Sequence, residues 1–523
     1  MHTSAQTPST LDIHDYVIVG GGSAGAVLAK RLSESGDNRV LLLEAGSAPH
    51  AEAYPPVLTD ANRIAAPDAP QFDWGYYSEP QGTTPAIFLP RGKVLGGCSA
   101  VNAAVAIRAP QWTFDQWAKE GLQGWSFDEV LPFFKRMERS TYGADRWHGR
   151  TGEFPIHRMS RDFILRQQNA FIDAAIHQGH QEVTDFNSDL NEGVGPLSMN
   201  IINGVRVNTG MTYLDQTVRQ RENLTIRTGV VADRIEFSGK RARAIISAQG
   251  ERFQGREIIL CAGAYGSPAI LMRSGIGLAQ DLSRLGIRPL VDTPVGQNLQ
   301  EHPFYFMGYA SPAGKLDDCE GPIAGAQLWT HSTQAEPGEL DLAILPEQFL
   351  IPNSPTGAGM TLSVALLSVR SRGQLRLSSA EPTTAPTINL NLLHHPQDMR
   401  RMVEGVHLAR ELAATQPLAS YLLTELTPGA AIKSDAQLRD DLLRNISIYQ
   451  HPTSTAMMGR EDDSRAVTDP QGRVYGTDGL RVVDASILPS VPLINPNPTI
   501  IAIAEKIAAT LLGQAPLLPV MHG

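Results

Sequence analysis

The chain has 523 residues, which exceeds the size at which one hydrophobic core usually stops growing, so we expect two or more packed regions. Its residues are 42% hydrophobic and 19% charged, as in ordinary globular proteins. The net charge of -10 excludes a dominantly basic surface, so we expect no nucleic-acid partner and no binding to anionic membranes. A small molecule is the expected partner.

The cysteines Cys98, Cys261 and Cys319 are odd in number and far apart in the sequence. They predict neither a disulfide framework nor a zinc site, and we expect no metal. Residues 1–15 are polar, and no run of about 18 apolar residues occurs anywhere. The sequence therefore indicates a cytoplasmic protein in a reducing compartment, without a membrane span.

The first motif is a strand, a glycine-rich turn and a helix. The apolar run Tyr16–Val19 leads into Gly20–Gly25, and helix-favouring residues follow. Gly20 permits a tight turn, Gly22 lets backbone amides approach a pyrophosphate, and Gly25 lets the helix pack against the strand. The residues that we assign to the nucleotide in this turn are Gly20, Gly22, Ser23, Ala24 and Gly25.

A second apolar run, Val40–Leu43, ends in Glu44, about 20 residues after the glycine turn. A dinucleotide-binding fold places its ribose-binding acid at this offset, so we expect Glu44 to accept hydrogen bonds from an adenosine ribose. Ala45 belongs to the same predicted site. The fingerprint alone fits NAD and FAD equally well.

Two later stretches, Arg91–Asn102 and Gly263–Gly277, resemble the two sequence signatures of the glucose-methanol-choline (GMC) oxidoreductase family. Three shorter segments are also similar to the family and occur in its order: Phe72–Trp74, Gly296–His302 and Gly479–Ser486. Together the similar regions cover roughly residues 13–306 and 370–510. The resemblance selects FAD over NAD.

The resemblance also implies where the cofactor is held. The paired glycines Gly96 and Gly97 let the chain pass close to a planar ring and to phosphates. By resemblance, the further cofactor-binding residues are Trp74, Val94, Gly97, Asn102, Val105, Ala232, Asp484, Ala485 and Pro496. Family members that tether the flavin carry a histidine just before the signature asparagine, where this chain has Val101, so we expect non-covalent FAD.

The middle of the chain predicts an antiparallel sheet covered by a helix. Met360–Val369 and Gly373–Leu377 alternate like strands, and Met402–Ala414 has helical periodicity. The expected fold is α/β, with a doubly wound, Rossmann-like FAD-binding domain and a discontinuous α+β substrate-binding domain on an antiparallel sheet. The expected divisions are 13–306 with most of the FAD-binding domain, 307–445 with the substrate-binding domain, and 446–515 returning with the catalytic residues.

The segment Tyr449–Thr455 resembles the active-site strand of the family, in which a histidine before a proline faces the flavin. His451 is therefore the expected catalytic base. In Leu493–Thr499 the resemblance points to Asn495 as its partner, and a one-residue ambiguity leaves Asn497 as the alternative. Asn497 also fits the N-cap of a helix from Thr499 to Leu512, with Pro498 at the first helical position.

These features predict FAD-dependent oxidation of an alcohol, a small primary one, to an aldehyde. In that interpretation His451 takes the hydroxyl proton, Asn495 hydrogen-bonds the alkoxide oxygen, and hydride passes to flavin N5. The alternatives are a flavin-dependent non-redox enzyme, such as a lyase or photodecarboxylase, and a flavin-binding protein without catalysis. The sequence leaves open the alcohol, the oligomeric state, and whether oxygen or another electron acceptor reoxidises the flavin.

Overall fold

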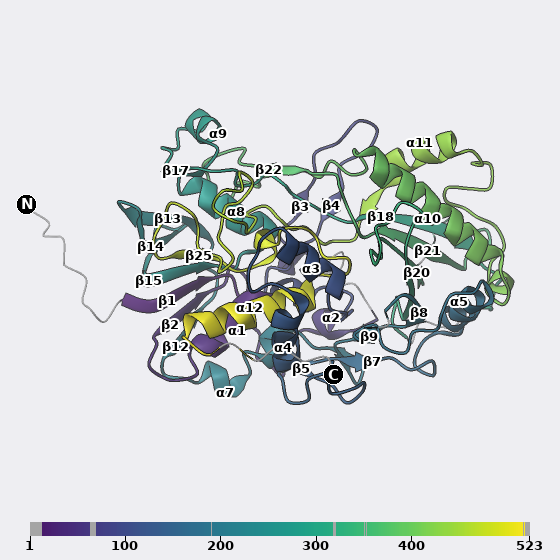
Figure 1. The fold of residues 1–523 in the computed structure, drawn as a ribbon, viewed down its shortest axis with the longest axis horizontal. Coiled ribbons are helices and arrows are strands. Elements are labelled where there is room, and N and C mark those ends of the chain that lie inside the picture. The colour runs from purple at the N-terminus through teal and green to yellow at the C-terminus, as the bar shows by residue number, and fades with distance from the viewer. Residues whose placement is uncertain are drawn as a thin grey trace, which may run out of the picture.

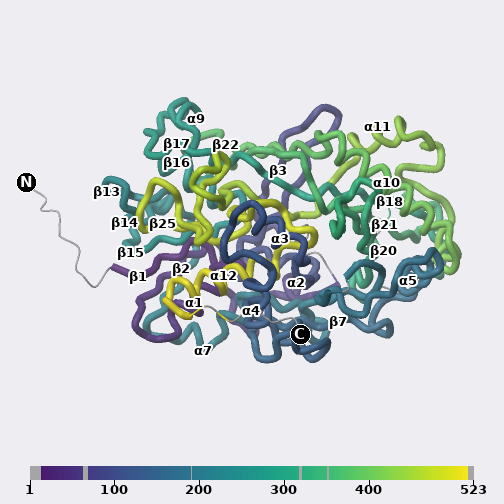
Figure 2. The backbone as a smooth tube through the Cα atoms, viewed as in Figure 1, coloured from purple at the N-terminus to yellow at the C-terminus, as the bar shows by residue number. Residues whose placement is uncertain are grey.

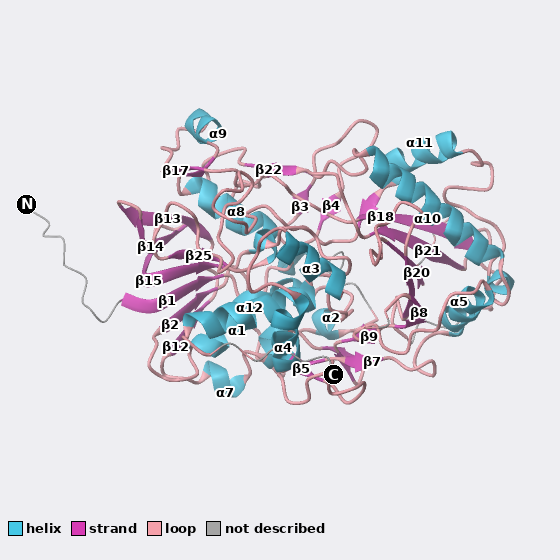
Figure 3. Cartoon of the chain, in the orientation of Figure 1, coloured by secondary structure: helices cyan, strands magenta, loops and turns pink. Residues whose placement is uncertain are grey.

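The computed structural model describes residues 13–62, 69–189, 191–316, 321–349, 351, 353–515 and 517. Its two larger sheets lie apart in Figure 1, with a group of helices between them, and the remaining strands form two-stranded pairs. Figure 3 shows the strands of both sheets in magenta and the intervening helices in cyan. This arrangement confirms the predicted fold class, an α/β nucleotide-binding region with a separate antiparallel sheet.

The first sheet has seven strands and is mostly parallel. Its order is β12-β2-β1-β15-β14-β13, and β25 pairs with β15. Strands β12, β2, β1, β15 and β25 run parallel to their neighbours, whereas β14 and β13 are antiparallel. The bounds are β1 Ile13–Val19, β2 Val40–Leu43, β12 Leu224–Arg227, β13 Ala232–Ser238, β14 Arg241–Ser247, β15 Arg252–Leu260 and β25 Leu480–Val482.

Segments from the two ends of the sequence pack together against this sheet. Helix α1 (Ser23–Leu32) lies beside helix α12 (Asn497–Leu511), and α12 also contacts α4 (Phe127–Met137). Figure 2 shows the yellow C-terminal segment returning to the purple N-terminal one. The nucleotide-binding region is therefore discontinuous in sequence, because its last helix comes from the far end of the chain.

The second sheet has six antiparallel strands in the order β24-β18-β21-β20-β19-β8. Its strands are β8 Gly193–Pro196, β18 Pro303–Ala310, β19 Ala326–Thr330, β20 Leu342–Glu347, β21 Gly359–Leu366 and β24 Ser447–Ile448. Helices α10 (Pro396–Ala414) and α5 (Arg166–His177) pack on this sheet. Helix α10 begins earlier than its periodicity predicts, because Pro396 fits the first turn and His395 caps it by accepting the Gln397 N–H at 3.2 Å.

One predicted strand does not join the six-stranded sheet. The segment that we expected at Gly373–Leu377 forms β22 (Gln374–Arg376), which pairs only with β23 (Thr387–Asn389). The reason lies outside the segment: the Leu375 N–H donates to the Gly296 carbonyl at 2.7 Å, and this bond holds the segment away from β21. The prediction of one continuous sheet was wrong at this position.

Short elements complete the fold. The remaining helices are α2 Pro56–Thr59, α3 Gln111–Lys119, α6 Thr209–Thr212, α7 Gln216–Arg219, α8 Gly263–Arg273, α9 Ala279–Arg284, α11 Asp435–Asn445, and the 3-10 turns Pro70–Phe72, Gly97–Ala100, Leu418–Tyr421 and Ala485–Ile487. The remaining strands are β3 Tyr76–Tyr77, β4 Phe88–Leu89, β5 Glu138–Arg139, β6 Phe154–Pro155, β7 His157–Arg158, β9 Ser198–Met199, β10 Ile201–Ile202, β11 Val205–Arg206, β16 Ile276–Gly277 and β17 Val291–Asp292. Over the described part of the chain, no helix has the length and apolar character needed to cross a membrane.

Candidate active site

The glycine turn after β1 has the geometry that its sequence predicted. Gly20 adopts φ +100°, a conformation that residues with a side chain rarely take. A Cβ atom at Gly25 would lie 1.9 Å from the Gly20 carbonyl oxygen, so only glycine lets α1 pack this closely. Ser23 and Ala24 form the first turn of α1, and the Ser23 hydroxyl donates to Asn497 Oδ1 at 2.6 Å, which joins the N-termini of α1 and α12.

Gly22 faces the second glycine-rich turn. A Cβ at Gly97 would lie 2.7 Å from Gly22 Cα, whereas a Cβ at Gly22 would meet nothing closer than Gly97 Cα at 3.7 Å. The two backbones therefore approach without side chains between them, beside the free N–H groups at the start of α1. Bare backbone next to a helix N-terminus is the environment that binds a pyrophosphate.

Glu44 follows β2 and is 5% exposed. Its two carboxylate oxygens accept the Gly21 and Gly46 N–H groups, each at 2.8 Å. Burial raises the pKa of Glu44, and these backbone hydrogen bonds oppose that rise. Glu44 therefore stabilises the glycine turn directly, while its expected contact with a ribose stays a prediction, as does that of the neighbouring Ala45.

The parallel strands end at one edge of the sheet, and several predicted cofactor residues follow them there. Asp484 comes after β25, and its Oδ2 accepts the Gly263 N–H at 2.9 Å and the Ser267 hydroxyl at 2.5 Å. Ala485 begins the adjoining 3-10 turn, and Pro496 precedes the first residue of α12. The structure thus brings the glycine turn, Asp484 and the start of α12 to neighbouring places.

The other predicted cofactor residues lie around this edge. Val94 is fully buried and accepts the Gly97 N–H at 2.7 Å. Asn102 Oδ1 accepts the Ala104 N–H at 3.0 Å. Trp74 is 36% exposed and stacks on Tyr76 with 6.1 Å between ring centroids, and Ala232 begins β13. Their contacts with FAD stay predictions.

His451 is brought to a second histidine by strand pairing. Strand β24 precedes His451, and β18 begins directly after His302, and these strands pair through Ile448 and Pro303. As a result His302 Nδ1 and His451 Nδ1 lie 3.0 Å apart, within hydrogen-bonding distance. His302 is fully buried, whereas His451 is partly exposed.

The surroundings keep both imidazoles neutral. Burial lowers the pKa of His302 to about 3. Burial, followed by the neighbouring His302 and the positive charge of Arg91, lowers the pKa of His451 well below its ordinary value of 6.5. In a neutral imidazole one ring nitrogen carries a hydrogen and the other has a lone pair that can accept a proton. The hydrogen bond made by the first nitrogen determines which nitrogen keeps the lone pair.

The sequence analysis assigned no role to His302, Glu301 and Arg91, although the structure places all three at or next to His451. Glu301 Oε1 accepts the His451 N–H at 2.6 Å and the His302 N–H at 2.9 Å. Burial raises the pKa of Glu301 to about 8, against the opposing charge of Arg91. The available signal was the His-Pro pair at residues 302–303, which repeats the pair at 451–452.

Arg91 holds the turn that precedes the histidine. Its Nη2 donates to the backbone carbonyl of Gln450 at 3.0 Å and to the side-chain oxygen of Gln450 at 2.9 Å. Gln450 adopts φ +69°, an unfavourable conformation for a residue with a side chain. Arg91 therefore stabilises a strained turn that sets the position of His451.

The two asparagines considered for the second active-site position have different partners. Asn495 is 8% exposed, its Nδ2 donates to the Val105 carbonyl at 2.6 Å, and its Oδ1 has no hydrogen-bond partner among the described residues. Asn497 accepts from Ser23. The predicted N-cap is one residue off: α12 begins at Asn497, with Pro496 in the cap position and no side-chain cap bond. Pro498 fits the second helical position as well as the first, which explains the shift.

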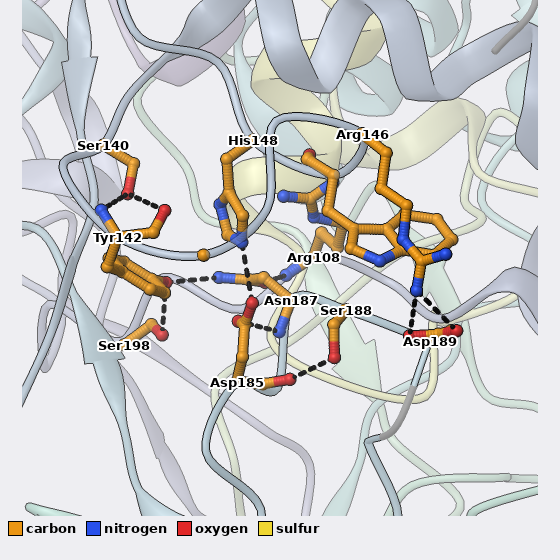
Figure 4. A network of polar contacts seen from close by, with 12 residues as sticks. Arg108, Ser140, Tyr142, Arg146, His148, Asp185, Asn187, Ser188, Asp189 and Ser198 are labelled. Atoms are coloured by element: carbon orange, nitrogen blue, oxygen red, sulfur yellow. Dashed lines mark hydrogen bonds and ion pairs between the residues drawn. The ribbon is translucent and has the colours of Figure 1, made fainter.

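A second buried histidine lies in a network that the sequence analysis did not identify (Figure 4). His148 is 2% exposed, and its Nδ1 and Nε2 lie 2.7 Å from Glu138 Oε1 and Asp185 Oδ2. Arg108 also bonds Glu138 at 3.1 Å, and its backbone N–H donates to Asn187 Oδ1 at 2.8 Å. The network ties the segment after Val105 to two distant loops.

The described residues contain no group of three or more histidine, cysteine or acidic side chains placed to bind a metal. Cys98 and Cys261 are free thiols, and Cys319 lies outside the described residues.

Comparison with known proteins supplies the family. Two family models described as GMC oxidoreductase match residues 14–304 and 369–504. The chain is 35% identical over 538 residues to the oxygen-dependent choline dehydrogenase of Rhizobium etli, covering 96% of each protein. It is 36% identical over 545 residues to that of Ectopseudomonas mendocina, covering 96% of this chain and 94% of the relative.

Solved structures agree with this assignment. The crystal structure of pyridoxine 4-oxidase from Mesorbium loti superposes with a TM-score of 0.88 at 33% identity, covering 96% of this chain and 100% of that one. A crystal structure of formate oxidase superposes with a TM-score of 0.85 at 24% identity, covering 96% of this chain and 98% of that one. The similarity to formate oxidase, at 24% identity, shows a shared fold only.

Proposed function

The chain belongs to the GMC oxidoreductase family, and on that premise we propose that it oxidises a small primary alcohol to an aldehyde with His451 as the base. Enzymes of this family are FAD-dependent and act on CH–OH donors. The observation that carries the proposal is the His451–His302 pair, a neutral imidazole held beside a second one at 3.0 Å. By their names, the related enzymes act on alcohols as different as choline and pyridoxine.

The residues present fit FAD. The bare backbones of Gly22 and Gly97 and the adjacent start of α1 suit a pyrophosphate. The start of α12 lies beside them through the Ser23–Asn497 hydrogen bond, and its free N–H groups suit a region that gains negative charge on reduction. When bound, FAD supplies the two-electron acceptor for the alcohol.

The roles of the side chains follow from their hydrogen bonds. If His451 donates its Nδ1 proton to His302 Nδ1, its Nε2 lone pair is free to take the proton of the substrate hydroxyl. His302 is then a positioning residue that selects this tautomer. Asn495 is proposed to hold the substrate oxygen with the remaining N–H of its amide, since the other N–H is bonded to Val105. The alcohol carbon loses a hydride and its oxygen loses a proton, which forms the C=O bond.

We also propose that FAD is bound without a covalent bond. Val101 stands before Asn102 and has no nucleophilic atom, and Cys98 is the one reactive side chain in that turn. After acid precipitation the flavin should remain in the supernatant. A yellow washed pellet would show a tether.

The cofactor site has a test that does not depend on activity. Gly22→Val should fold, because a Cβ there meets no atom closer than 3.7 Å. The variant should nevertheless be purified without flavin, because its side chain would fill the space proposed for the pyrophosphate of FAD. Gly25→Val is the contrasting variant, and it should fail to fold because its Cβ would meet Gly20 at 1.9 Å. A yellow Gly22→Val protein would place the cofactor elsewhere.

The reaction itself is tested by mixing the purified holoenzyme with alcohols in the absence of oxygen. We expect a primary alcohol to bleach the yellow flavin and to yield the aldehyde. Release of a non-redox product with the flavin still yellow would favour the lyase or photodecarboxylase alternative. The same assay run with oxygen and with a redox dye then decides between an oxidase and a dehydrogenase.

A further inference from the structure

The six-stranded sheet has one face covered by helix α10 and one face that is turned away from it. A Cβ added at Gly405 of α10 would lie 2.7 Å from Val364 and 3.2 Å from Leu342, so these side chains point toward the helix. Successive side chains of a strand point to opposite faces. Ser363 therefore lies on the other face, which we call the inner face.

The inner face reaches His451 through a series of aromatic rings. Tyr449 lies 4.5 Å from His451 between ring centroids, and Phe304 of β18 stacks on Tyr449 at 4.5 Å. Phe306 follows at 4.9 Å from Phe304, and Phe349 lies 5.8 Å from Phe306. A continuous series of ring contacts thus connects His451 with the middle of the inner face.

A buried carboxyl group stands at the far end of this aromatic series. Phe306 pairs across the strands with Ser363, whose hydroxyl donates to Glu347. Glu347 is 6% exposed, and no basic side chain among the described residues pairs with it. Burial raises the pKa of Glu347 to about 7, and the hydrogen bond from Ser363 opposes this rise. A buried carboxyl with a single neutral partner has acceptor capacity left over.

A second polar group on the inner face, Gln327, makes no side-chain hydrogen bond within the part of the chain that the structure describes. Trp329 of β19 pairs with Ala343 of β20, and Gln327 and Glu347 share their face by the alternation of the two strands. Gln327 is fully buried, and within the described residues neither its amide nitrogen nor its oxygen makes a hydrogen bond. Such groups are costly to bury unless a ligand or water completes them.

We propose that Glu347 and Gln327 form a recognition site for the ring substituent of the substrate, an aromatic primary alcohol that also carries a hydrogen-bond donor. This inference rests on the proposed function. The hydroxymethyl group lies at His451, the ring lies along Tyr449 and Phe304, and the donor reaches Glu347. A protonated amine and a phenolic hydroxyl are the two donor types that a carboxylate accepts well.

The test uses matched pairs of benzyl alcohols that differ in the donor alone. One pair is 4-hydroxybenzyl alcohol with 4-methoxybenzyl alcohol, and the other is 4-(aminomethyl)benzyl alcohol with 4-ethylbenzyl alcohol. Anaerobic flavin reduction by the holoenzyme should be about 10- to 100-fold more efficient with the donor-bearing member of at least one pair. Which pair shows the preference identifies the donor type.

The decisive variant is Glu347→Gln, which keeps the size of the side chain and removes its charge. We expect it to reduce the preference for the donor-bearing alcohol to within about threefold. Glu381→Gln is the matched control, since Glu381 is exposed on a loop and the same charge is lost there. Its preference should equal that of the wild type.

Gln327→Leu tests the second group by two readouts. Because the variant removes an amide without partners, its melting temperature should not fall, while the substrate preference should drop several-fold. Binding of 4-hydroxybenzaldehyde against 4-methoxybenzaldehyde, followed by the flavin absorbance, gives the same comparison even where turnover is slow.

The outcomes separate this inference from the proposed function. If benzyl alcohols bleach the flavin but Glu347→Gln retains the full preference, or if the wild type shows none, the recognition site is wrong and the proposed function stands. If aliphatic alcohols alone bleach the flavin, the aromatic substrate class is wrong. If no alcohol bleaches it, the proposed function itself fails.

Discussion

The two buried histidine sites of this molecule place the same side chain in opposite electrostatic surroundings. His451 lies beside a second imidazole and the guanidinium of Arg91, and burial together with these charges lowers its pKa well below 6.5. For His148, burial also acts to lower the pKa, but hydrogen bonds to Asp185 and Glu138 outweigh it and raise the pKa. One imidazole is therefore neutral at neutral pH, and the other favours its charged form.

The difference in protonation state distinguishes a histidine that can take part in a reaction from one that stabilises the fold. A neutral imidazole with a free lone pair can take a proton from a substrate. An imidazolium that donates both N–H groups to carboxylates has no lone pair left, but it joins the segments that carry those carboxylates. In Figure 4, His148 and Asp185 lie in different loops, with Asn187 and Arg108 beside them. We infer that His451 serves the reaction and that His148 serves the fold.

The largest expected effect comes from removing the proposed base. His451→Ala should retain FAD and its melting temperature, but anaerobic flavin reduction by an alcohol should slow by about 10²- to 10⁴-fold, the usual worth of a positioned proton acceptor. Stopped-flow absorbance of the flavin measures this rate directly. A near-wild-type rate would remove His451 from the mechanism.

His302→Gln sharpens the same experiment, because glutamine keeps an acceptor near His451 but does not reproduce the imidazole. A positioning role predicts a smaller loss of rate, together with a changed pH profile of flavin reduction. A loss of rate without any change in the pH profile would indicate that His302 acts through packing.

Removing His148 should have the opposite signature. His148→Ala leaves the buried Glu138 and the partly buried Asp185 with Arg108 as the remaining cation of the network, and breaking a buried charged network typically costs about 3–5 kcal/mol of the free energy of unfolding. Denaturant unfolding should show this loss, while the folded holoenzyme should reduce its flavin at close to the wild-type rate. A stable His148→Ala protein with slow flavin reduction would overturn the division of roles.

Much of the nucleotide-binding region could be predicted because its constraints are local. Gly20 is required because its φ is positive, and Gly25 is required because a Cβ there would lie 1.9 Å from the Gly20 carbonyl oxygen. Both requirements arise within one short motif, so the local sequence reveals them. Strand β22 was misplaced because its pairing depends on Gly296, about 80 residues away. The start of α12 was misplaced by one residue because two helical positions accept Pro498 equally.

Sequence motifs pointed to individual candidate residues, but they did not reveal which distant residues meet them. His451 stood in a recognisable segment, but its contact with His302 arises from the pairing of β18 with β24, which no local pattern encodes. His148 had no motif around it, and its role depends on carboxylates from two other segments. Glu347 and Gln327 gained meaning only when strand alternation placed them on one face.

A smaller effect distinguishes the two asparagines near His451. Asn495→Ala should slow flavin reduction by about 10²-fold, as expected for one lost donor to a developing alkoxide. Asn497→Ala should instead weaken the junction between α1 and α12, because its Oδ1 accepts from Ser23, and should leave the rate less affected. If Asn497→Ala has the larger effect on the rate with unchanged melting temperature, the assignment of the two positions is reversed.

The smallest effect is the pH dependence of stability at His148. A histidine whose pKa is raised by folding stabilises the protein fully below its unfolded pKa of about 6.5, and loses that contribution as the pH rises through the raised folded value. His451 and His302 have lowered pKa values, so they act in the opposite sense and cost stability as the pH falls below about 6.5. Comparing the wild type with His148→Gln cancels their contribution. The melting temperature of the wild type should exceed that of the variant by about 2 °C more at pH 6 than at pH 9. An equal gap at both pH values would show that His148 is neutral in its network.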